Sequence, residues 1–521
     1  MKVGSKRIEL LGANKLKGGT FNGRKINKVI GNVRFKHEGA IMYCDSAYQY
    51  LDKNVIDAFG HVKIIKGDST RLYGKTLNYD GDRRLAKVRG DVKLVNGTRT
   101  LTTDFLDYNM AADLADYYEG GIVVDKETTL ESVKGTYNLN SEVYSFSDSV
   151  SVLRDSYLMR SDTLVYNSIS KIAKFFGPTH ITSEDKHLFA LSGEYHTVSE
   201  VSKFKDSAWV ETKDQLLKGD SLYYENNKDF GFAKGNVYML SKEDSLIITG
   251  GEGFRNGTTG YAKVYDNPIM RKVDDGDTMY ISADTLVAID DTINNVQNLQ
   301  AFYHVKLYRD EMQGLCDSMF YSFTDSIIYF FKSPVLWNEL NQITADTIRV
   351  KMRDGQIDKM YADIGAFLIQ EESIGNYNQV KGRNMVATFS NNQINNVDVN
   401  GNGESIYFAY NDAQELIGMN KVICSNMLVQ FINQELNSIS FLKQPDANFI
   451  PPQQLGMGDK QLKDFKWLIS QRPDKASVMR AHPTAASTTE NQDDDEGDID
   501  QAQDKLTRKE KKALREERKQ D

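Results

Sequence analysis

Short apolar runs separated by polar turns recur along this chain at a nearly constant spacing. In residues 218–240 (KGDSLYYENNKDFGFAKGNVYML), three apolar runs are separated by a polar turn and then by a glycine. The same layout occurs at residues 42–65, 73–95 and 159–182. In each copy a marker residue precedes a glycine by 15 positions, in the pairs Asp45–Gly60, Lys75–Gly90, Asp162–Gly177 and Asp220–Gly235. Such regular spacing identifies a repeat protein.

The repeat unit is about 30 residues long, and about a dozen units fill residues 28–450. Runs such as DTLVYN and DSLYYE are rich in Thr, Val and Tyr and alternate over short lengths, as half-buried strands do. The segments between them, such as LDKN and ENNK, have the composition of tight turns. Because a parallel connection needs a long crossover, strands joined by short turns form antiparallel hairpins.

A small break interrupts each unit between its second and third apolar runs. It is held by residues that tolerate left-handed or bulged backbone, namely Gly60, Gly90, Gly120, Gly177, Gly235, Asp148, Asp206 and Asn267. Pro178, Pro268 and Pro334 lie at or beside the same point, where a ladder hydrogen bond is absent. A bend at one fixed place folds a wide sheet over on itself. The sequence therefore predicts an all-β fold, an elongated antiparallel β-jellyroll or solenoid with two walls.

The chain divides by composition into five segments. Residues 1–27 form a lead-in, and residues 28–240 and 241–455 hold the two halves of the repeat array. Residues 456–475 carry Leu462, Phe465, Leu468 and Ile469 at helical spacing, which predicts an amphipathic helix that caps the array. Residues 476–521 are highly charged and predict a disordered tail.

The charge and the apolar content of the chain argue against some classes of function. The 521 residues carry a net charge of −9, which argues against a nucleic-acid partner because polyanion binding needs a basic face. No run of about 20 apolar residues predicts a transmembrane segment. The first residues lack the apolar core of a secretory signal, so an exported protein would be shown here in a mature or truncated form.

Candidate catalytic or metal-binding residues do not gather in the sequence. The marker aspartates stand singly, one per unit, which favours a structural role over calcium binding. The histidines form no HExxH pattern, and GGEGFRNG at 250–257 lacks the Lys-Ser/Thr of a phosphate loop and is interpreted as a wide glycine turn. Cys44, Cys316 and Cys424 share one repeat position and are expected to stay unpaired. We expect no enzyme, no metal and no cofactor; a polysaccharide-active β-helix would need clustered carboxylates.

The apolar positions of successive units would form one continuous interior. In a closed sandwich they fill a core, whereas between splayed walls they line a groove for a lipid chain. Each acyl methylene that enters such a groove gains about 0.8 kcal/mol. The candidate groove residues are Val62, Ile64, Leu77, Tyr79, Val92, Leu94, Leu164, Tyr166, Leu222, Tyr224, Val237 and Met239.

Two short motifs recur among the strands, as AFGHV (58–62), VRGDV (88–92) and AKGNV (233–237), and as YGKTLNY (73–79) and KGDSLYY (218–224). In this pattern the chain resembles the OstA-like family of lipopolysaccharide-transport proteins. The resemblance implies a periplasmic, outer-membrane-associated β-jellyroll whose apolar interior shields lipopolysaccharide acyl chains. It also implies partners that add by edge-strand pairing to other β-jellyroll transport components.

Two functions follow as hypotheses. In the first, the protein shuttles or bridges lipopolysaccharide or a related glycolipid across the periplasm without catalysis. In the second, it is a solid scaffold of the cell envelope with a filled core. The amount of free volume inside the trough distinguishes them.

Overall fold

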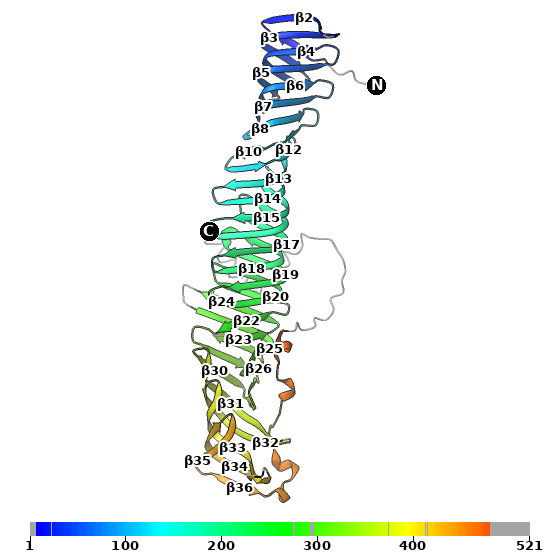
Figure 1. The fold of residues 1–521 in the computed structure, drawn as a ribbon. Coiled ribbons are helices and arrows are strands. Elements are labelled where there is room, and N and C mark those ends of the chain that lie inside the picture. The colour runs from blue at the N-terminus through cyan, green and yellow to red at the C-terminus, as the bar shows by residue number, and fades with distance from the viewer. Residues whose placement is uncertain are drawn as a thin grey trace. The chain divides into compact units, whose positions relative to one another are not determined.

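The repeats form one continuous antiparallel sheet. The computed structural model describes residues 7–21, 23–274, 277–291, 296–373, 375–411, 413 and 415–479. Within them, 36 strands belong to a single sheet and follow one another largely in chain order (Figure 1). Each pairing is antiparallel, as between β4 (Ala40–Tyr50) and β5 (Val55–Lys66). The predicted all-β antiparallel fold is confirmed.

The strands have the following bounds. The first are β1 (Glu9–Gly12), β2 (Lys15–Phe21), β3 (Arg24–His37), β6 (Thr70–Asp80), β7 (Leu85–Asn96), β8 (Arg99–Asn109), β9 (Leu114–Tyr117), β10 (Gly121–Asp125), β11 (Thr128–Ser132) and β12 (Lys134–Asn138). Next come β13 (Val143–Arg154), β14 (Tyr157–Asn167), β15 (Ile172–Thr182), β16 (Lys186–His196), β17 (Val201–Thr212), β18 (Gln215–Glu225), β19 (Phe230–Ser241), β20 (Leu246–Asn256), β21 (Tyr261–Tyr265), β22 (Ile269–Asp274), β23 (Asp277–Ser282) and β24 (Thr285–Asp291). The last are β25 (Val296–Arg309), β26 (Met312–Ser322), β27 (Ile327–Phe331), β28 (Val335–Asn338), β29 (Asn341–Thr344), β30 (Thr347–Arg353), β31 (Gln356–Ser373), β32 (Asn376–Ser390), β33 (Gln393–Tyr410), β34 (Leu416–Ile432), β35 (Glu435–Leu442) and β36 (Asp446–Ile450).

The sheet begins earlier than the sequence indicates. Strands β1 and β2 both pair with β3, so the described part of the predicted lead-in belongs to the sheet. Glycines and lysines dominate this segment and hide its strand character, since neither residue type favours strands.

Every predicted bend has left-handed backbone. All eight residues assigned to the break have positive φ, for example 75° at Gly60 and 72° at Gly235. At Gly60 the register of β5 against β6 shifts between Phe59 and Val62, as at a bulge. A Cβ on Gly60 would lie 2.3 Å from Oδ2 of Asp45, because the marker side chain packs against the bend. The constant 15-residue offset thus reflects a contact across neighbouring strands.

The bend divides each regular strand into two halves, and each half belongs to a different wall of the sheet. In β5, Ile56 and Ala58 before the bend and Val62 and Ile64 after it are all buried. Two left-handed residues at the bend keep the alternation in phase, so both halves of the strand present the same face to the interior. One apolar cluster runs through the array from Ile8 to Phe431. The interior therefore lies between two walls that meet at the bends.

The C-terminal segment differs from its prediction. The predicted helix over residues 456–475 is absent. This range contains 3₁₀ turns at Met457–Lys460 and Ile469–Gln471, after an earlier one at Pro452–Gln454, and the short helix α1 (Lys475–Met479) begins only at its last residue. We call residues 451–479 the C-terminal strap.

Side chains of the sheet explain why the strap is not helical. Gln379 donates to the carbonyl oxygen of Lys460 (2.8 Å) and accepts from the N–H of Leu462 (2.8 Å). Gln342 bonds the strap in the same way, through the carbonyl of Lys466 and the N–H of Leu468. The strap backbone thus finds its hydrogen-bond partners on the sheet instead of in its own helix turns.

The strap covers apolar side chains on the outer face of the last strands. Phe367, Ile369, Ile406, Phe408 and Met419 of these strands form a second apolar cluster together with Leu462 of the strap. The predicted charged tail lies, from residue 480 onward, outside the described residues. None of the helices described here is long and apolar enough to cross a membrane.

Candidate functional site

The structure brings all twelve predicted groove residues into one apolar interior. None of them is more than 7% exposed, and all belong to the continuous cluster between the walls. Six lie after the bend of their strand on one wall: Val62, Ile64, Val92, Leu94, Val237 and Met239. Six lie on the facing wall: Leu77, Tyr79, Leu164, Tyr166, Leu222 and Tyr224. Their role in lipid binding remains a prediction.

Two rows of hairpin turns form the free margins of the walls. The first turn row is flanked by strand-end residues, namely His37, Lys66, Arg99, Asp125, Tyr157 and Lys186, which we count with it. The second turn row contains Arg84, Asp113, Glu142, Lys171, Thr197 and Asp229. Hydrogen bonds and ion pairs connect residues of the two rows that are 40 to 47 positions apart in sequence. The open side of the trough is thus closed by a polar seam.

Tyrosine side chains of the facing wall extend from the apolar interior to this seam. The hydroxyl of Tyr166 donates to Asp125 at 3.1 Å, and the hydroxyl of Tyr79 lies 2.7 Å from Nδ1 of His37. Both rings are fully buried. Tyrosine suits this place because its ring is apolar and its hydroxyl needs a polar partner. Burial next to Asp125 raises the pKa of Tyr166.

Ion pairs strengthen the seam. Asp125, whose side chain is 1% exposed, accepts from Lys171 at 2.5 Å and lies near Arg99. Arg99 also pairs with Glu142 at 2.7 Å. Charged groups this deeply buried persist only when they are paired.

In a second seam carboxylate, Asp113, burial and hydrogen bonding have opposite effects on the pKa. Burial alone would raise its pKa, but hydrogen bonds from Lys66 and Tyr108 outweigh burial, and its pKa is lowered. Lys66 also donates to the carbonyl oxygen of Met110 at 2.8 Å. These hydrogen bonds thus favour the charged form of Asp113.

The seam continues near the C-terminal end with uncharged partners. Arg309 donates to the carbonyl of Gly355 (2.6 Å), Asn338 to that of Asn392 (3.1 Å) and Gln370 to that of Gln434 (2.8 Å).

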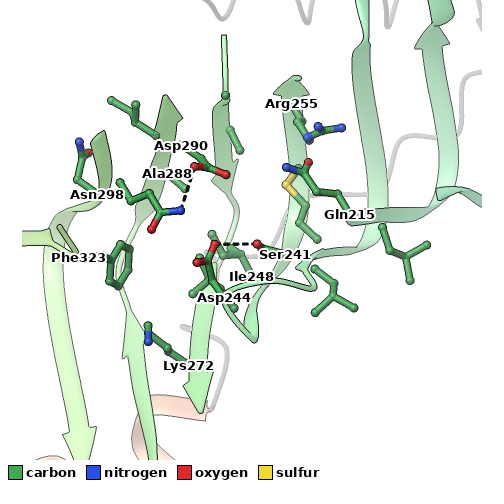
Figure 2. A pocket seen from close by; sticks show the side chains of 18 residues that line it. Gln215, Ser241, Asp244, Ile248, Arg255, Lys272, Ala288, Asp290, Asn298 and Phe323 are labelled. Atoms are coloured by element: carbon green, nitrogen blue, oxygen red, sulfur yellow. Dashed lines mark hydrogen bonds between the residues drawn. The ribbon is translucent and has the colours of Figure 1, made fainter. Parts of the chain in front are cut away.

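Between these stretches, a cavity of about 270 Å³ separates the two rows. Ser241, Asp244 and Lys272 from the first row surround it together with Asp290, Asn298 and Phe323 from the second (Figure 2). Its other lining residues are Gln215, Leu216, Met239, Leu240, Leu246, Ile248, Arg255, Gly260, Ala262, Ala288, Ile289 and Gln297.

Sequence reasoning missed this cavity, although a signal was present. Tyr79, Tyr166 and Tyr224 stand four positions after a marker residue, whereas four positions after the marker Asp284 the residue is Ala288. A departure from a repeat's consensus at an interior position predicts a local change of packing.

The interpretation of GGEGFRNG as a wide glycine turn is wrong. Gly250 and Gly253 lie within strand β20. A Cβ on Gly250 would approach Val264 Cγ1 to 2.5 Å, and one on Gly253 would approach Met239 Cε to 3.0 Å. These glycines make room for neighbouring interior side chains.

The cysteines are free, as predicted. Burial raises the pKa of Cys44 to about 11 and that of Cys316 to about 12. Such thiols are unreactive near neutral pH. No group of three or more His, Cys, Asp or Glu side chains suited to a metal ion occurs in the part of the chain that the structure describes.

Comparison with protein-family models identifies a family that is similar to part of this chain. A family model described as "OstA-like protein" matches residues 5–162 and again residues 155–220. A search of curated proteins found no match to the chain.

Proposed function

The chain belongs to the OstA-like family through residues 5–220, and we propose that it binds and shields lipopolysaccharide acyl chains between its two walls. Members of this family are transport proteins of the cell envelope. In the proposed role the protein bridges or shuttles the lipid across the periplasm toward the outer membrane. The observation that carries the proposal is the single apolar interior that continues from unit to unit.

The energetics favour insertion of a lipid chain. Burial of about twelve methylenes stabilises by roughly 10 kcal/mol at about 0.8 kcal/mol each. Breaking a buried ion pair such as Asp125–Lys171 costs about 3–5 kcal/mol. One inserted chain can therefore offset the local opening of one or two seam contacts. In this mechanism the walls part around the chain and close behind it, while the energy for directed movement comes from another component.

Partners would add at the two ends of the sheet. Strands β1 and β2 lie at one end and β35 and β36 at the other, and unpaired strand edges accept further strands. Other β-jellyroll transport components are the proposed partners at these edges.

A second candidate function is a scaffold with a filled core. It is favoured by the close packing of the interior, where side chains such as Leu164 and Tyr166 have no exposed area. In this role the seam would stay closed and no lipid would enter.

Site-specific photocrosslinking distinguishes the two candidates. A benzoylphenylalanine at the buried Leu164 probes the interior, and one at the neighbouring exposed Thr163 is the matched control on the outer face. The transport role predicts that purified lipopolysaccharide labels position 164 and spares position 163. Labelling of position 163 alone, or of neither, would favour the scaffold.

A further inference from the structure

The cavity between the turn rows lies where the repeat loses its large interior side chains. In β20 and β24, Arg255 and Ala288 occupy the positions that Tyr224 occupies in β18, as the strand registers through β19 and β21 show. Tyr224 is 1% exposed, whereas Ala288 is only half-buried. The loss of tyrosine rings in consecutive hairpins leaves the volume that elsewhere closes the seam.

The lining of the cavity has two chemical parts. Its floor is apolar and consists of interior residues such as Met239, Ile248 and Ala262. Its rim carries Arg255 and Lys272 together with Asp244 and Asp290, so the charges of the rim balance. The apolar floor, and not the net charge, therefore selects the ligand.

One buried polar atom in the lining lacks a partner. Asn298 is 7% exposed, and its side-chain oxygen accepts no hydrogen bond in the structure. A buried acceptor without a donor is unfavourable, and a hydroxyl or amide N–H from a ligand would satisfy it. Asn298 is a lining residue at the margin of the cavity, and its amide points away from the other lining side chains (Figure 2).

We propose that this cavity is a lateral port through which a single acyl chain of a glycolipid passes between the outside and the interior. This inference rests on the proposed lipid-binding function and adds a defined route to it. A volume of about 270 Å³ lies just below the range of about 300–1,000 Å³ typical of sites that hold a whole small ligand. The cavity therefore admits part of one chain, which suits a passage better than a storage site.

The variant Ala288→Tyr tests the port because it restores the side chain that the repeat uses at this position. Ala288→Ser is the matched control, since serine leaves the cavity open. Ala262→Leu fills the same space from the strand that pairs with Ala288 and serves if the tyrosine variant does not fold. Folding of each full-length variant is checked by circular dichroism and thermal unfolding.

The readout is the rate at which purified lipopolysaccharide labels a photocrosslinker at Leu164, which lies far from the port in sequence. We expect Ala288→Tyr or Ala262→Leu to label at least about tenfold more slowly than the wild type and Ala288→Ser to match the wild type. Equal rates in all variants would overturn the port while leaving the proposed function intact. A complete lack of labelling, in the wild type as well, would overturn the proposed function and the port with it.

Discussion

The replacement of Asp125 by asparagine tests whether the seam holds the walls together. The Asp125 carboxylate is 1% exposed and is approached by Lys171 at 2.5 Å and by Arg99 at 3.7 Å. Asp125→Asn keeps the shape of the side chain but leaves Lys171 without its counter-charge, whereas Arg99 keeps its ion pair with Glu142. Removing one partner of a buried pair costs about 3–5 kcal/mol. Because the side chain of Lys171 is 22% exposed, we expect the loss of stability to lie at the lower end of this range, about 3 kcal/mol.

Hydrogen exchange of the amides in β10, β14 and β15 measures this change locally, because repeat arrays open in parts. A loss of about 3 kcal/mol speeds exchange through local opening by about a hundredfold, since each 1.4 kcal/mol is tenfold. Asp148→Asn is the matched control. Asp148 pairs with Lys134 at 2.8 Å, but both side chains are more than half exposed, so its loss costs about 0–1 kcal/mol. If both variants exchange alike, the seam is not what holds the margins together.

Three further predictions follow from the bends, the strap and the buried phenols and thiols. Gly235→Ala is expected to destabilise the folded protein by about 1–3 kcal/mol, because φ is 72° and the new Cβ would lie 2.3 Å from Asp220. Gly67→Ala is the control, since φ there is 60° and the new Cβ would meet open space. We expect thermal unfolding to show a smaller loss of stability for Gly67→Ala. Gln379→Ala should release the strap, since it leaves a buried carbonyl and N–H unsatisfied at about 1–3 kcal/mol each, and limited proteolysis after residue 455 should become faster; unchanged cleavage would contradict this. Burial raises the pKa of Cys44 to about 11 and of Tyr117 to about 12, so these groups favour the folded state below their unfolded pKa values. Their stabilisation is lost as pH rises from about 9 to 12, and tyrosinate absorbance should therefore rise together with unfolding instead of before it.

The regular part of the fold could be predicted because its determinants are local and repeated. The glycine at each bend and the marker residue 15 positions earlier are visible in the sequence, and they meet in the structure, as in Asp220 and Gly235. Alternation within each strand likewise identified the interior residues, all twelve of which are buried.

The seam and the strap could not be predicted in this way, because their contacts join residues far apart in sequence. Lys171 meets Asp125 across 46 positions, and Gln342 meets Leu468 across 126. The apolar spacing of Leu462 and Phe465 suggested a helix, but these side chains pack on the outer face of the sheet from a strap with only short 3₁₀ turns. Tertiary hydrogen bonds overrode the local helical pattern.

Distance measurement across the seam tests most directly whether the two walls part around a lipid. Spin labels at Glu127 and Ser170, both exposed and in turns that flank the Asp125–Lys171 pair, report the separation of the two rows. With purified lipopolysaccharide bound, we expect the distance between the labels to increase by about the width of one acyl chain, and to return when the lipid is removed. An unchanged distance in a sample that demonstrably holds lipid would show that the lipid binds elsewhere and that the interior is a filled core.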